Sequence, residues 1–191
     1  MKKRQSENYR IIANKFLNSK NYKKAKKFYE LALKKDSKNI KLLYNCAYFY
    51  DKIDNLEKAL EMYNQILKLS DNEQGAFYGK ATIFDRLDKL KMAEKNYKLA
   101  IKSDDKYYQA YLYLADIYER LNKNELAEKN YIKAIKVNKN NFWAYNNYGV
   151  FLEDQNKDKL ALKQFEKALK NDSENFKAYF NKGVVYKKIG K

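Results

Sequence analysis

Apolar and small residues recur along the chain with a period of 34 residues. The most regular position is an alanine, which is followed four residues later by an aromatic ring and seven residues later by a small or aliphatic residue. Offsets of four and seven lie on one face of an α-helix, so each such stretch predicts an amphipathic helix. The three positions are Ala25, Ala59, Ala93, Ala127 and Ala161; Tyr29, Tyr63, Tyr97, Tyr131 and Phe165; and Ala32, Ile66, Ala100, Ala134 and Ala168.

A second stripe with the same period lies upstream of each alanine and predicts a partner helix. In this stripe a large residue is followed by a small residue after four positions and by another large residue after seven. Small residues facing each other, such as Ala13 against Ala25, would let the two helices approach closely. The stripe consists of Tyr9, Leu43, Phe77, Tyr111, Tyr145 and Tyr179; Ala13, Ala47, Ala81, Ala115, Gly149 and Gly183; and Phe16, Tyr50, Phe84, Tyr118, Leu152 and Tyr186.

The paired helices resemble the tetratricopeptide repeat, whose unit is a 34-residue helical hairpin. The order of the family motif is reproduced by Tyr145, Tyr148, Gly149, Leu152, Ala161, Phe165 and Ala168. The resemblance implies an all-α, right-handed superhelical solenoid in which the first helix of each unit, helix A, lines the concave face. The expected units are 6–39, 40–73, 74–107, 108–141 and 142–175, preceded by a basic lead at 1–5 and followed by a half repeat or capping helix at 176–191.

The family proline that ends each unit is missing, because the chain contains no proline. Asp, Ser and Asn can stop one helix and cap the next without proline, so we expect the turn to be kept with less rigidity. The positions are Ser37, Asp71, Asp105, Lys139 and Ser173.

The last expected helix contains more large apolar residues than a capping helix, whose outer face must be polar, would need. Phe176, Tyr179 and Phe180 accompany Gly183, the small residue that would pack against a following helix. Two interpretations stay open: residues 176–191 belong to a longer array, or this end forms a homodimer.

The composition offers few of the residue types that commonly act in catalysis. The chain has no histidine and one cysteine, Cys46, which is expected to be a buried structural thiol. We therefore expect no enzyme, no cofactor and no metal site. No apolar run is long enough to cross a bilayer, and an internal disulfide is impossible, so we expect a cytoplasmic, intracellular protein without a membrane partner.

A peptide or helix of a partner protein, held in the concave groove, is the expected ligand. Rings mixed with Asn, Asp and Arg are typical of binding surfaces. Trp143 is the one tryptophan and lies outside the core register, so it predicts either a binding contact or packing against a neighbouring helix A. The groove candidates are Arg10, Asn14, Tyr44, Asn45, Tyr48, Tyr78, Thr82, Leu112, Asp116, Trp143, Asn146 and Phe180.

One form of this hypothesis is the clamp by which some family members hold the C-terminal carboxylate of a chaperone. Arg10, Asn14 and Asn45 match three of its five positions. Gly75 and Gly79 stand where the family has two cations, and this absence argues against a clamp.

The net charge of +17 favours a different class of partner, an acidic protein or RNA. Residues 1–39 carry 13 basic and 3 acidic residues, whereas residues 40–175 carry 23 basic and 21 acidic residues. A nucleic-acid groove would need charge along its whole length, so electrostatic binding is expected at the basic first repeat, if the lysines do more than keep the protein soluble.

Overall fold

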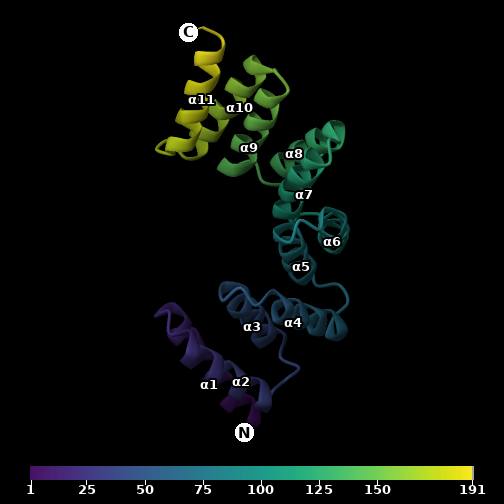
Figure 1. Ribbon diagram of the computed structural model, residues 1–191, viewed down its shortest axis with the longest axis vertical. Coiled ribbons are helices and arrows are strands. Elements are labelled where there is room, and N and C mark those ends of the chain that lie inside the picture. The colour runs from purple at the N-terminus through teal and green to yellow at the C-terminus, as the bar shows by residue number, and fades with distance from the viewer. Residues whose placement is uncertain (191) are drawn as a thin grey trace. The chain divides into compact units, whose positions relative to one another are not determined.

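The computed structural model describes residues 1–190, and these form helices joined by short turns (Figure 1). No strand occurs in the described residues. The chain divides into two compact units, residues 1–88 and 89–191. Each unit is described by itself below.

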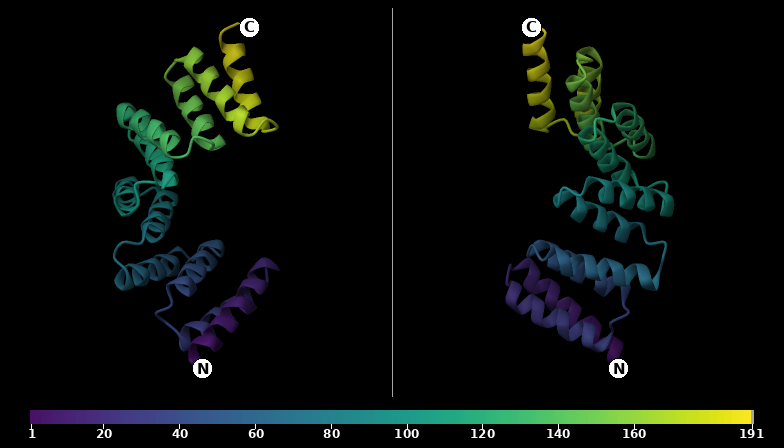
Figure 2. Two further views of the ribbon diagram at one scale, coloured as in Figure 1. Left: turned by 180° about the vertical axis from the view of Figure 1, so that it is seen from behind. Right: turned by 45° about the vertical axis from the view of Figure 1, so that its right-hand side comes forward.

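Unit 1 contains helices that pack in antiparallel pairs (Figure 2). Helix α1 pairs with α2, and α3 pairs with α4, against which α5 also packs. The bounds are α1 Lys2–Asn18, α2 Tyr22–Lys35, α3 Ile40–Lys52, α4 Leu56–Leu69 and α5 Gln74–Arg86. Because α1 already begins at Lys2, most of the expected basic lead at 1–5 belongs to the first helix.

Unit 2 continues the same alternation. Helix α7 packs on α6 and α8, α9 packs on α8 and α10, and α11 packs on α10 and α9. The bounds are α6 Leu90–Ser103, α7 Tyr108–Arg120, α8 Asn124–Val137, α9 Phe142–Asp154, α10 Asp158–Asn171 and α11 Phe176–Lys188. We call the odd-numbered helices A helices and the even-numbered helices B helices.

The turn inside each hairpin is closed without glycine. One residue in each turn has a positive φ between 55° and 59°, and these residues recur every 34 positions: Lys20, Asp54, Asp88, Asn122 and Asn156. In four of these turns, those at Lys20, Asp54, Asn122 and Asn156, the next residue donates its N–H back into the last turn of the A helix, as Asn55 does to the Tyr50 carbonyl at 2.8 Å. This bond satisfies a carbonyl that the helix end would leave unpaired.

The turns between hairpins correct one expectation. Ser37, Lys139 and Ser173 lie within the turn itself and do not cap the following helix. The cap is formed two residues later by Asn39, Asn141 and Asn175, whose side chains accept a backbone N–H of α3, α9 and α11. An Asn in this position replaces the stop that proline would give.

The core consists of the predicted B stripe and the small A residues facing it. All five alanines at the first B position are fully buried, as are Tyr29 and Phe165 four residues later. The contact is close: a Cβ atom on Gly149 would lie 2.5 Å from the ring of Phe165. Cys46 is buried in unit 1, and burial raises the pKa of its thiol to about 12, which fits the predicted structural role.

Gly149 and Gly183 occupy the same register and therefore make a matched pair for a stability test. We expect Gly149→Ala to destabilise the protein by about 1–3 kcal/mol, because the buried Phe165 ring must move. Gly183→Ala meets nothing within 4 Å, and we expect it to stabilise α11 by up to about 1 kcal/mol through helix propensity. Urea unfolding followed by circular dichroism measures both, and equal effects would contradict the close contact at Gly149.

Candidate functional site

The candidate residues all belong to A helices. In unit 1 these are α1, α3 and α5, and in unit 2 they are α7, α9 and α11. Each set forms what we call the A face of its unit.

In unit 1 the three clamp-like residues meet in one hydrogen-bonded network. The Tyr29 hydroxyl donates to Asn14 Oδ1 at 2.6 Å. The Asn45 amide, oriented so that both of its polar atoms are satisfied, accepts from Arg10 Nη1 at 2.9 Å. Arg10 is buried and also donates from Nε to Glu7 at 2.8 Å, and this hydrogen bond lowers the pKa of Glu7. The network thus joins α1, α2 and α3.

Tyrosine rings occupy the two positions where a clamp would hold cations. The Tyr44 hydroxyl lies 3.0 Å from the place of a Cβ on Gly75 and donates to Glu73 at 3.2 Å. The Tyr63 ring would lie 2.2 Å from a Cβ on Gly79. Neither glycine could be replaced by a cationic residue unless these rings moved, so the packing argues against a carboxylate clamp.

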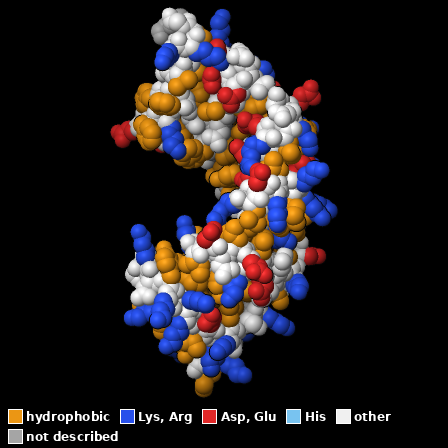
Figure 3. All heavy atoms as spheres, viewed as in Figure 1, with side chains coloured by type: hydrophobic (Ala, Val, Ile, Leu, Met, Phe, Trp, Pro, Cys, Tyr) orange, Lys and Arg blue, Asp and Glu red, His pale blue; other side chains and the backbone are white. Residues whose placement is uncertain are grey.

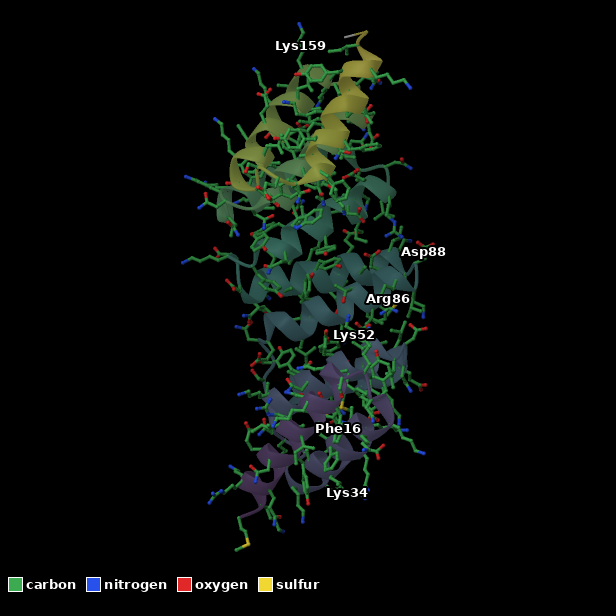
Figure 4. The ribbon with its side chains drawn as sticks, turned by 90° about the vertical axis from the view of Figure 1, so that its left-hand side faces the viewer. Phe16, Lys34, Lys52, Arg86, Asp88 and Lys159 are labelled. Carbon is green, nitrogen blue, oxygen red and sulfur yellow. The ribbon has the colours of Figure 1, made fainter. Side chains whose placement is uncertain are left out.

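The other unit 1 candidates differ in exposure. Tyr48 is exposed, and the ammonium of Lys52 lies 5.3 Å from the centre of its ring. Tyr78 and Thr82 are half-buried, and the Thr82 hydroxyl donates to the carbonyl of Gly79 at 2.9 Å. Arg86, labelled in Figure 4, forms ion pairs with Asp51 on α3 and with Asp54 in the turn that follows α3.

Two unit 2 candidates are buried between A helices. Leu112 is part of the core, and Asn146 accepts a hydrogen bond from Asn181 Nδ2 at 3.0 Å. Both residues therefore support the A face from beneath. Asp116 is exposed on α7, with its carboxylate 3.8 Å from Arg120 Nη1.

Trp143 and Phe180 present large apolar rings on the A face of unit 2. Trp143 is 44% exposed and Phe180 is 68% exposed. The ring of Trp143 packs edge-on against Phe142, and the ammonium of Lys177 on α11 lies 4.7 Å from its centre. In Figure 3 hydrophobic side chains gather around the start of α11. Trp143 thus contacts its neighbours and still keeps an open surface.

Two further residues belong to this face. The ammonium of Lys177 lies over the ring of Trp143, and Val150 is exposed on α9. The 34-residue register could have revealed Val150, since Val150 lies one repeat after Asp116 and three repeats after Tyr48, and both of these residues are candidates.

Three carboxylates gather toward the ends of α7 and α9. Burial raises the pKa of Glu119 to about 7, the hydrogen bond from the Tyr131 hydroxyl opposes this shift, and the charges of Asp116 and Asp154 add to it. Burial also raises the pKa of Asp154. The A face of unit 2 therefore combines an aromatic end with an acidic end.

The described residues hold no group of three or more His, Cys, Asp or Glu side chains that could bind a metal ion. Within residues 1–190, no helix is both long and apolar enough to span a membrane.

The Glu119 carboxyl predicts a pH-dependent stability. Its folded pKa is raised above the unfolded value, so its contribution is fully present below about pH 4.5 and is lost as the pH rises through about 7. We expect Glu119→Gln to be more stable than the natural protein at pH 8, by about 1–2 kcal/mol, and nearly equal to it at pH 4.5. Urea midpoints at the two pH values measure this, with Glu125→Gln, an exposed carboxylate on α8, as the control. A constant difference at both pH values would refute the shift.

Sequence comparison with protein families gives four matches of one type. Models described as tetratricopeptide repeat match residues 16–79, 108–141 and 130–163, and one described as TPR repeat matches residues 151–190. No curated protein sequence matches the chain.

Solved structures share this fold at low sequence identity. A crystal structure of MamA is 24% identical, covers 89% of this chain and 93% of its own, and has a TM-score of 0.73. YrrB, described as a TPR protein with an unusual peptide-binding site, is 19% identical over 92% of this chain and 90% of its own, with a TM-score of 0.68. PilF of Pseudomonas aeruginosa is 14% identical over 99% of this chain and 86% of its own, with a TM-score of 0.82.

The B helices begin every 34 residues, their Ala–aromatic stripe is buried, and four family models match, so the chain belongs to the tetratricopeptide repeat proteins.

Proposed function

We propose that this protein is a non-catalytic scaffold that binds a peptide segment of a partner protein on the A face of unit 2. The observation that carries the proposal is the exposure of two rings, Trp143 on α9 and Phe180 on α11, with the ammonium of Lys177 lying over the ring of Trp143. The peptide-binding description of YrrB, which has the same fold, supports this class of function.

The surroundings of the rings indicate the chemistry of the ligand. An apolar or aromatic side chain of the peptide would cover Trp143 and Phe180, because burying such rings contributes the most energy to a protein interface. A carboxylate beside that side chain would pair with Lys177. The acidic end, with Asp116 and Asp154, would favour a basic residue at the other end of the peptide and so fix its direction.

A substitution at Trp143 tests the proposal. Peptides selected from a display library against the natural protein should bind Trp143→Ala at least about thirtyfold more weakly, which is the loss of a typical hot spot. Helix content should stay unchanged, because the ring is not part of the buried core. Tyr22→Ala removes an equally exposed ring from α2 and serves as the control. Equal loss in both variants, or no loss at Trp143, would refute the proposed site.

Self-association through α11 is a second candidate. Tyr179 and Gly183 occupy the register that in α9 is covered by α10, yet Tyr179 is exposed and Gly183 has no neighbour within 4 Å. A second copy could bury this stripe together with Phe176, which is also exposed.

The molar mass in solution, measured by light scattering, tests whether the protein forms a dimer through α11. We expect a dimer that dissociates when Tyr179→Ser and Phe176→Ser are introduced together, since both changes remove exposed apolar area. The double variant Met92→Ser and Leu160→Ser removes exposed apolar side chains of α6 and α10 and is the control. A natural protein that stays monomeric at high concentration would exclude the dimer.

A further inference from the structure

Charges are distributed unevenly among the helices of unit 2, which counting along the chain conceals. The A helices α7 and α9 carry four carboxylates and one cation, whereas the third A helix, α11, carries four lysines and no carboxylate. The charged residues of α7 and α9 are Asp116, Glu119, Glu153, Asp154 and Arg120. The B helices α6, α8 and α10 carry eleven lysines against five carboxylates. The lysines are Lys91, Lys95, Lys98, Lys102, Lys129, Lys133, Lys136, Lys159, Lys163, Lys167 and Lys170, and the carboxylates are Glu94, Glu125, Glu128, Asp158 and Glu166. The near-neutral balance of residues 40–175 therefore hides a basic surface.

Most of these carboxylates are neutralised by cations that lie off the B helices. Glu128 pairs with Lys157 at 3.1 Å, and Asp158 pairs with Lys188 at 3.1 Å. Glu94 accepts from Lys98 and also from Lys123 at 3.5 Å. Glu166 pairs with Lys182 at 3.4 Å. These ion pairs neutralise four of the five carboxylates on the B helices. Lysines therefore remain in excess on the surface of these helices.

Two of the lysines, Lys98 and Lys167, lie over the A-helix rings of Tyr118 and Tyr145, and others point away from the A helices. Each B helix turns its buried stripe toward its A neighbours, so its opposite side faces outward. Lys95, Lys129 and Lys163 are exposed in the same register of α6, α8 and α10, and the described residues place no carboxylate within ion-pair distance of them. Figure 3 shows Lys and Arg side chains along the side of α6 and α8, and Figure 4 shows Lys159 extending outward from α10.

A row of exposed aliphatic side chains accompanies the lysines. Met92, Leu126 and Leu160 are 47%, 41% and 46% exposed and occupy one register of the three B helices. Folding does not require apolar residues at this register, because the equivalent positions of α2 and α4 hold Lys24 and Lys58. We call the row and its lysines the B face of unit 2.

Aromatic rings are absent from this face. The B helices of unit 2 contain one ring each, Tyr97, Tyr131 and Phe165, and all three are buried in the core. Single-stranded nucleic acid is held by stacking bases on exposed rings, which the B face does not offer. Exposed lysines around aliphatic side chains instead suit an anionic lipid surface, where headgroups attract the lysines and the aliphatic tips enter the interface.

We propose that the B face of unit 2 binds the surface of an anionic lipid bilayer. This peripheral contact goes beyond the peptide binding proposed for the A face and differs from the expectation of no membrane partner. Because the two surfaces belong to different helices, a partner held on α9 and α11 would remain accessible while α6, α8 and α10 rest on the membrane.

Vesicle co-sedimentation of the full chain tests this proposal. Vesicles of phosphatidylcholine are compared with vesicles in which roughly one third of the lipid is phosphatidylserine. We expect binding to the anionic vesicles alone, weakening as salt screens the lysines. Binding to both kinds of vesicle, or to neither, would overturn the proposal.

Two sets of substitutions with equal charge separate the B face from net charge. The face variant carries Lys95→Gln, Lys129→Gln, Lys133→Gln and Lys163→Gln, and should lose at least about tenfold in vesicle binding, since one lysine contributes about fivefold. The control carries Lys38→Gln, Lys41→Gln, Lys139→Gln and Lys187→Gln, all exposed and off the B helices of unit 2. The control should lose less than about threefold. Equal losses would overturn the proposal in favour of unspecific attraction.

The aliphatic row has its own test. Met92→Ser, Leu126→Ser and Leu160→Ser together should weaken anionic-vesicle binding several-fold while helix content stays constant. Unchanged binding would overturn the role of the row. Duplex RNA and poly-glutamate serve as competing ligands: if either loses affinity in the face variant while the vesicles never bind, the B face is a nucleic-acid or acidic-protein site instead.

Discussion

The contact between the B stripe and the small residues of the A helices is the interaction on which the rest of the structure depends. The alanines at the first B position and their partners, such as Ala13, are completely buried, and the ring of Phe165 lies so close to Gly149 that a methyl group could not be added without a shift. Neither helix of a hairpin can bury its stripe alone, so each B helix also packs on the next A helix. Stability is therefore divided among many equivalent contacts.

This arrangement leaves one side of every helix without a packing role, and those sides are where the sequence varies between repeats. On the A face one register holds Tyr48, Thr82, Asp116, Val150 and Val184 in successive helices. The residue type cannot vary freely at positions of the A helices where an aromatic ring from a neighbouring helix fills the space. Tyr63 fills the space at Gly79, and the polar network of Arg10, Asn14 and Asn45 serves to join helices in unit 1. The residues Arg10, Asn14 and Asn45, which match the carboxylate clamp in sequence, therefore hold helices together in the structure.

Charge follows the same division. The family fold places residues that are far apart in the sequence on a common surface every 34 positions, so lysines from α6, α8 and α10 add together while carboxylates collect on α7 and α9. The net charge summed over residues 40–175 is close to zero, because this sum adds the lysines of the B helices to the carboxylates of α7 and α9. In unit 2 the exposed rings Trp143 and Phe180 belong to A helices, whereas the exposed aliphatic residues Met92, Leu126 and Leu160 belong to B helices.

The sequence by itself determined the helices, their pairing and the core, because a 34-residue period with offsets of four and seven is set by local backbone geometry. It also located Trp143 outside the core register, where the ring is in fact exposed, whereas Phe180 is exposed although Leu112 and Asn146 in the same register are buried. Only the tertiary structure decided which polar candidates face solvent: Arg10 and Asn146 are buried by neighbouring helices, whereas Asp116 is not. It also decided that Asn39, and not Ser37, caps α3, and that the carboxylates of the B helices pair with lysines from other elements. These outcomes depend on distances between side chains from different repeats, which the local periodicity does not contain.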